Sequence, residues 1–132
     1  MTTTEFDPSK KMIVVEAAVW GPRGKAPLRL VVDTGSWQTL IVPDVMDDLG
    51  FNPRDGEAIT AVYSAIGKEQ GYMIGVPCFS ALGYTIPEFS VHVFDLADRY
   101  GIDGLLGLSF LQRYNYQVRS AEGVILVEEI AA

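Results

Sequence analysis

The chain has 132 residues and a formal net charge of −7, and this length suggests one domain that folds without metal or disulfide support. The negative charge argues against nucleic acid or an anionic membrane as a partner, because both demand a basic surface. With one cysteine and no apolar run as long as a membrane helix, the sequence predicts a cytoplasmic protein.

Short β-rich segments separated by Gly- and Pro-rich turns make up most of the sequence. Residues 1–11 are polar and we expect them to be frayed, whereas residues 12–132 are expected to form a single domain. Alternating or β-branched apolar residues predict strands over 12–20, 28–33, 37–42, 58–66, 71–83, 85–96, 105–108 and 123–130.

Two short helices interrupt this pattern. The first is expected over about Pro43 to Leu49, with Gly50 just beyond its end. The second is expected over Ser109 to Tyr114, with Ser109 as its N-cap. The element order therefore predicts an all-β fold, a closed or nearly closed barrel with one or two short helices.

The segment VVDTGS, residues 31–36, places an aspartate at the end of an apolar strand. Asp33 either caps a local turn or carries out chemistry. A second segment, IDGLLG, follows at residues 102–107. Together the two segments resemble the retropepsin-like aspartic protease family, particularly its small bacterial and cellular members.

The resemblance extends from about Met12 to Ile130 and implies that Asp33 is catalytic. In this family the Asp-Thr-Gly turn lies beside a downstream apolar-apolar-Gly segment, and Thr34 hydrogen-bonds across a dimer axis. Gly35 permits a tight turn that brings its N–H near the carboxylate. The resemblance thus implies support of the active site by Thr34, Gly35, Ser36, Leu105, Leu106 and Gly107.

A single aspartate cannot perform metal-free peptide hydrolysis, which requires both a base for water and an acid for the leaving amine. Two carboxylates about 3 Å apart share one proton and supply both functions, and aspartic proteases are the standard example. The sequence holds one Asp-Thr-Gly only. The second carboxylate must then be Asp33 of another copy, which predicts a homodimer acting on peptide or protein substrates.

The hairpin expected over residues 58–82 resembles the flap of the family, which closes over an extended peptide. Its tip is expected between Ala65 and Gly71. Tyr63, Ile66 and Gly67 are the candidate substrate contacts.

Two positions depart from the retroviral pattern. Retroviral members usually carry an acidic residue after the Asp-Thr-Gly turn, paired with an arginine after the second glycine. This chain has Trp37 and Gln38 in the first region, and Leu108 and Ser109 in the second. The departure leaves an alternative, in which the fold is a catalytically inactive interaction module that binds extended peptide segments.

Other polar residues have structural interpretations. The only histidine, His92, is expected on the outer face of its strand, which argues against a His-dependent triad or a zinc site. Asp103 is expected to order its loop, and Cys78 to be a small buried hydrophobe. We expect no cofactor and no metal.

Overall fold

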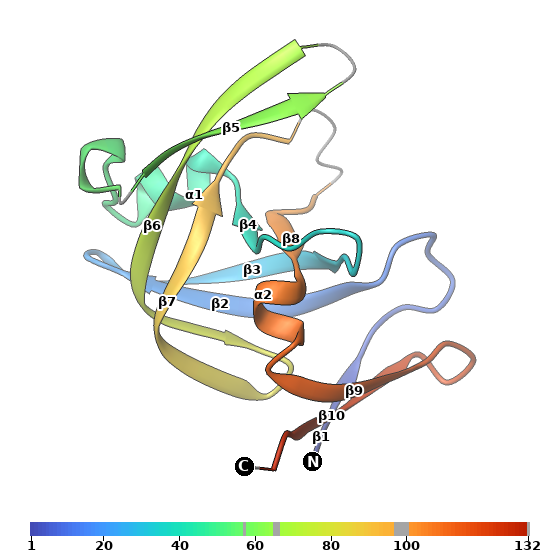
Figure 1. Cartoon of the computed structure of the whole chain (residues 1–132). Helices are drawn as coiled ribbons and strands as arrows, with labels where there is room; N and C mark the ends of the chain where they lie inside the picture. Colours follow the sequence, from blue (N-terminus) through green and yellow to red (C-terminus); the bar gives the residue numbers. More distant parts are fainter. Residues whose placement is uncertain (57, 65–66, 97–100, 132) are drawn as a thin grey trace.

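Six strands close into a barrel. The computed structural model describes residues 1–56, 58–64, 67–96 and 101–131. Around the barrel the strands follow the order β2 (Val14–Gly21), β3 (Gly24–Val32), β8 (Gly104–Leu106), β4 (Leu40–Ile41), β7 (Tyr84–Val93) and β6 (Gly67–Ala81). Pairing between β6 and β2 closes the ring (Figure 1). The expected closed, all-β barrel is confirmed.

The hairpin of β5 (Ala58–Ser64) and β6 extends beyond the ring. β5 pairs antiparallel with the first half of β6, from Gly67 to Met73, while the rest of β6 belongs to the barrel wall. Figure 1 shows the hairpin projecting from the end of the barrel opposite the two termini. The hairpin predicted between residues 58 and 82 is therefore present, built on a strand of 15 residues.

In the described residues, three short helical segments lie between strands. The predicted first helix is confirmed as α1 (Pro43–Asp48), and Gly50 follows it with a φ of 90° while its N–H donates to Asp47. A single 3₁₀ turn, η1 (Pro53–Asp55), follows. The second helix, α2 (Leu108–Leu111), is shorter than predicted, and its N-cap is Gly107 rather than Ser109.

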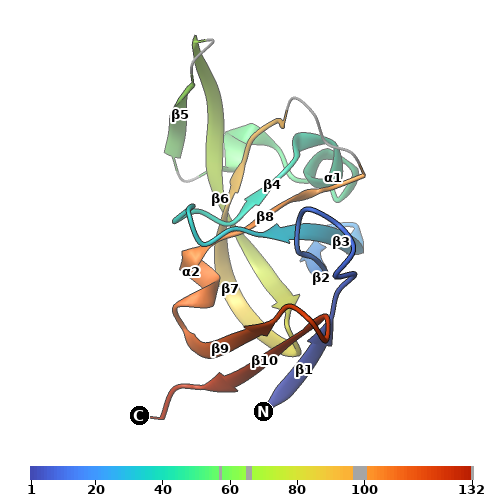
Figure 2. The ribbon, with the colours of Figure 1, turned by 90° about the vertical axis from the view of Figure 1, so that its right-hand side faces the viewer.

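The N-terminal segment is a strand, and the expectation of frayed residues was wrong for β1 (Thr2–Glu5). A second, three-stranded sheet has the order β1, β10 (Val124–Glu129) and β9 (Tyr114–Arg119). Thr2 pairs with Val127, and its hydroxyl donates to the carbonyl of Leu82 at 2.6 Å. Long-range pairing orders this polar segment, and Figure 2 shows the sheet at the end of the molecule that carries both termini.

An aromatic cluster attaches α2 to the barrel core. Phe110 is fully buried and its ring lies 5.6 Å from that of Phe79, 6.1 Å from Phe89 and 5.2 Å from Tyr114. Edge-to-face and tilted packing of this kind adds to the hydrophobic contribution of the rings. Because Phe110 lies three residues beyond Gly107, the cluster also fixes the backbone that enters the helix.

The expected outer-face position of His92 was wrong. His92 is only 7% exposed, and its neighbours Val91 and Val93 are also buried, so β7 is covered on both faces near its end. Cys78, expected to be buried, is only half-buried and carries a free thiol. No helix in the described part of the chain is long and apolar enough to span a membrane.

Burial lowers the pKa of His92 below its ordinary value of 6.5. The unfolded chain then takes up a proton before the folded chain does, so the His92 contribution makes the free energy of unfolding fall as pH drops below about 6.5. We expect His92→Gln to flatten this loss. Urea unfolding at about pH 5 and about pH 8 measures it, because the glutamine side chain is neutral at both values. An unchanged difference between the two pH values would contradict the assignment.

Candidate active site

The two sequence motifs lie side by side in the barrel. β3 and β8 pair in parallel, so that Val31 lies beside Leu105 and Val32 beside Leu106. Asp33 follows directly, and its N–H donates to the carbonyl of Leu106 at 2.9 Å. The two motifs, some 70 residues apart in the sequence, are thus brought together by the pairing of β3 with β8. This pairing places the Asp33 carboxylate at the start of a loop.

The Asp33 loop, residues 33–38, is a tight turn held by its own backbone. The N–H of Gly35 donates to Oδ1 of Asp33 at 2.9 Å, and the N–H of Ser36 donates to the carbonyl of Asp33 at 3.3 Å. Thr34 and Gly35 are exposed, whereas Asp33 is half-buried. The backbone therefore orients the carboxylate while leaving the apex of the turn open to solvent or to a second molecule.

Gly107 lies against the other end of the Asp33 loop. A Cβ built on Gly107 would overlap the Gln38 carbonyl oxygen and lie 2.8 Å from the Ser36 carbonyl oxygen. The N–H of Leu108 donates to Ser36 and that of Ser109 donates to Trp37, both at 2.8 Å. Glycine is therefore required for this close backbone approach.

A partly buried pair of hydroxyls behind the loop, Thr39 and Ser109, was not predicted from the sequence. Thr39 is 1% exposed, and its Oγ1 lies 2.9 Å from Oγ of Ser109. The N–H of Gly107 donates to the same Thr39 oxygen at 3.3 Å. The sequence held one signal of this pair, because Thr39 directly precedes the apolar run Leu40–Val42. A polar side chain that is buried with such a run needs a hydrogen-bond partner.

Asp103 orders the backbone, as expected from the sequence. Its carboxylate accepts the N–H of Arg29 at 2.8 Å, and its own N–H donates to the Arg29 carbonyl at 2.7 Å. The Asp103 carbonyl accepts the N–H of Val42 at 2.9 Å. These bonds connect Asp103 to the barrel strands on either side of β8.

The predicted hairpin contacts are only partly located. Tyr63 on β5 pairs with Lys68, and Gly67 on β6 pairs with Ser64, next to the hairpin turn. Ile66 lies outside the described residues. Trp37, in the Asp33 loop, is 57% exposed, which is unusual for so large an apolar side chain.

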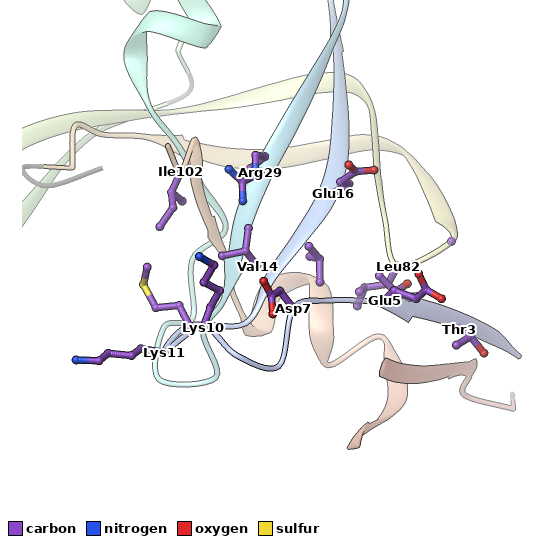
Figure 3. A pocket seen from close by; sticks show the side chains of 14 residues that line it. Thr3, Glu5, Asp7, Lys10, Lys11, Val14, Glu16, Arg29, Leu82 and Ile102 are labelled. Atoms are coloured by element: carbon purple, nitrogen blue, oxygen red, sulfur yellow. The ribbon is translucent and has the colours of Figure 1, made fainter. Parts of the chain in front are cut away.

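A cavity of about 1070 Å³ is lined by residues outside the Asp33 loop (Figure 3). Its wall comes from the N-terminal segment, β2, Arg29, the Leu82–Gly83 turn and Ile102, and it mixes basic Lys10 and Lys11 with acidic side chains. This cavity is therefore separate from the Asp33 loop. Within the described residues, no group of three or more His, Cys, Asp or Glu side chains is placed to hold a metal ion.

A closed barrel in which an Asp-Thr-Gly loop contacts a second apolar-Gly segment is the arrangement expected of an aspartic protease fold. The profile of the aspartyl protease family matches residues 15–110, and the chain belongs to that family. The match includes Asp33, Gly107 and the segments around both. No match was found among the curated proteins.

Solved structures share the retropepsin-like fold. A retropepsin-like aspartic protease from Rickettsia conorii has a TM-score of 0.69 and 19% identity, covering 95% of this chain and 87% of its own. The retroviral protease-like domain of Ddi1 from Leishmania major has a TM-score of 0.61 and 18% identity, covering 92% of each chain. EIAV protease in complex with the inhibitor HBY-793 has a TM-score of 0.58 and 18% identity, covering 79% of this chain and 88% of its own.

Proposed function

We propose that the chain is an aspartic endopeptidase that works as a homodimer, with Asp33 of each copy at the two-fold axis. The observation that carries this proposal is the contact between the Asp33 loop and Leu106–Gly107 in a member of the aspartyl protease family. The half-buried carboxylate at the mouth of an exposed turn fits a group that meets a partner.

In the proposed dimer, the two Asp33 carboxylates share one proton. The ionised carboxylate removes a proton from a water molecule, which attacks the peptide carbonyl carbon. The protonated carboxylate hydrogen-bonds to the carbonyl oxygen and then supplies the proton that the leaving amine requires. The Gly35 N–H, at 2.9 Å from Oδ1, holds its carboxylate in a fixed orientation throughout.

The need for a second copy follows from what one chain offers. The sequence has a single Asp-Thr-Gly, so the other carboxylate must come from a symmetry mate. The large cavity of the single chain is lined by the N-terminal segment rather than by the Asp33 loop. A substrate cleft formed between two copies would not exist as a cavity in one of them.

The hairpin of β5 and β6 is the proposed flap. It extends beyond the barrel, and within the described residues β5 pairs with β6 only. Tyr63, Ile66 and Gly67 remain the proposed substrate contacts on it, with an extended peptide as the substrate.

A non-cleaving interaction module is the second candidate. Trp37 and Gln38 stand where the family's retroviral members have an acid, and Trp37 exposes a large apolar surface beside the Asp33 loop. Such a surface suits the binding of an extended apolar segment without hydrolysis.

Oligomeric state and cleavage together separate the two candidates. We expect the purified chain to cut a pool of extended peptides, detected by mass spectrometry. Its activity per chain should fall on dilution from a few hundred μM to about 1 μM, because dimers dissociate. Sedimentation velocity over the same range should show the dimer. A strict monomer that binds peptide and leaves it intact would favour the interaction module.

A further inference from the structure

Thr39 is the most deeply buried polar side chain in the described part of the chain, with 1% of its surface exposed against 7% for His92. A buried hydroxyl is unfavourable unless it is hydrogen-bonded. Thr39 meets this requirement twice, through the Gly107 N–H at 3.3 Å and the Ser109 hydroxyl at 2.9 Å. Both partners belong to the segment of residues 106–109, which leads from β8 into the first turn of α2.

This segment also carries the bonds that hold the Asp33 loop. Leu106 accepts the Asp33 N–H, and the N–H groups of Leu108 and Ser109 donate to the loop carbonyls of Ser36 and Trp37. These are all backbone bonds, so the position of the loop depends on where the segment lies. Thr39 joins the far end of the loop to the same segment through its side chain.

The close backbone approach at Gly107 makes the position of the Asp33 loop sensitive to small shifts of this segment. Since the ideal Cβ position at Gly107 overlaps the Gln38 carbonyl oxygen, the two backbones touch one residue before Thr39. Their N–H and carbonyl groups then need a partner at the contact, and Thr39 Oγ1 supplies the acceptor for Gly107. Phe110, buried in the aromatic cluster, fixes the helix on the other side.

We propose that the Thr39–Ser109 hydroxyl pair positions Gly107 and, through it, the Asp33 loop. Oγ1 of Thr39 accepts the Gly107 N–H, and a second hydrogen bond joins the same oxygen to the Ser109 hydroxyl. The pair touches no reacting atom and is a positioning device. Its effect on hydrolysis rests on the proposed function, in which two Asp33 carboxylates must meet at about 3 Å. Small misplacements of reacting groups cost up to about a hundredfold in rate.

The test uses three variants. Thr39→Val removes the hydroxyl at nearly constant shape, Thr39→Ser restores it, and Ser109→Ala removes the partner. We expect Thr39→Val to lower kcat about 10- to 100-fold with KM changed by less than about threefold, and Thr39→Ser to recover kcat to within about threefold. Ser109→Ala should have a smaller effect, because the Gly107 bond survives. The double variant Thr39→Val/Ser109→Ala should be no worse than Thr39→Val.

A core variant in the other sheet serves as the control for a general loss of stability. Ile125→Val lies in β10 of the terminal sheet and removes one buried methylene group. Thr39→Val must lose kcat where Ile125→Val, compared at a temperature giving the same folded fraction, does not. Equal losses in the two variants would overturn the proposal, and so would full kcat in Thr39→Val or no recovery in Thr39→Ser.

A second measurement keeps the inference independent of protease activity. Amide hydrogen exchange at Gly107 and at the Asp33 and Gly35 N–H groups reports the loop directly. We expect exchange there to be about tenfold faster in Thr39→Val and normal in Thr39→Ser. If the wild-type chain cuts no peptide but these rates change as described, the proposed function fails while the positioning role holds. Unchanged rates overturn the positioning role. If Thr39→Val does not fold, Ser109→Ala is judged by the same two measurements.

Discussion

Replacing Asp33 with asparagine is expected to lower peptide hydrolysis by at least about a thousandfold, while the fold and the dimer remain. An asparagine at this position in each copy would leave the proposed pair with neither a base nor an acid, and this kind of catalysis contributes about 10² to 10⁴ in rate. The amide oxygen can still accept the Gly35 N–H that Asp33 Oδ1 accepts at 2.9 Å, so the turn is preserved. Initial rates on a cleaved peptide, circular dichroism and sedimentation velocity measure the three properties.

Asp103→Asn is the matched control. Asp103 also precedes a glycine, but its carboxylate accepts the backbone N–H of Arg29 on β3, and an asparagine oxygen can do the same. Its activity should stay within about threefold of wild type, since isosteric changes that preserve a hydrogen bond are mild. Peptidase activity that persists in Asp33→Asn would refute the assignment of Asp33.

Mixed dimers test the two-copy requirement more sharply. When wild-type chains are equilibrated with a growing share of Asp33→Asn chains, each mixed dimer carries a single Asp33 carboxylate. Activity should then follow the square of the wild-type fraction, because only dimers with two intact copies hydrolyse peptide. A linear dependence would mean that each chain acts alone.

Gly107→Ala is expected to be strongly destabilising. The added Cβ would overlap the Gln38 carbonyl oxygen and lie 2.6 Å from the Gln38 carbonyl carbon, and neither atom belongs to a flexible side chain. Overpacking costs about 1–3 kcal/mol, and contact with rigid backbone places this variant at or above the upper end. The midpoint of urea unfolding measures the loss.

Gly35→Ala provides the comparison at the opposite end of the loop. The nearest atom to its Cβ would be Asp33 Oδ1 at 3.2 Å, which belongs to a side chain, and Gly35 has no positive φ. Its free energy of unfolding should remain within about 1 kcal/mol of wild type. If Gly107→Ala unfolds at the same urea concentration as Gly35→Ala, the close backbone approach is not a constraint on the fold.

The barrel and the motif contact were predictable because their signals are local and strong. The apolar segments around Asp33 and Gly107, the Gly- and Pro-rich turns, and the punctuation of α1 by Pro43 and Gly50 all predicted elements that the structure contains. Membership of the aspartyl protease family is likewise confirmed. The roles of the site residues remain predictions, since they concern a second copy and a substrate.

The elements that were missed depend on partners far away in the sequence. β1 has the sequence TTTE and no apolar alternation, and it is ordered by pairing with β10 and by the Thr2–Leu82 hydrogen bond. His92 follows a strand alternation that predicts an outer face, but the barrel covers that face at the end of β7. Ser109 has the residue type of an N-cap, yet its hydroxyl bonds Thr39 instead.

The two ends of β6 pair with different strands, and this difference has a consequence for how the molecule can move. From Tyr72 to Ala81 the strand is bonded to β7, and over its last residues also to β2, while from Gly67 to Met73 it carries β5. Within the described chain β5 is bonded to β6 alone. Separating β5 from β6 leaves every bond of the ring intact, so this motion draws on a local free energy well below that of global unfolding. Substitutions that soften or stiffen the hairpin can therefore change its opening rate while leaving the melting temperature of the barrel nearly constant.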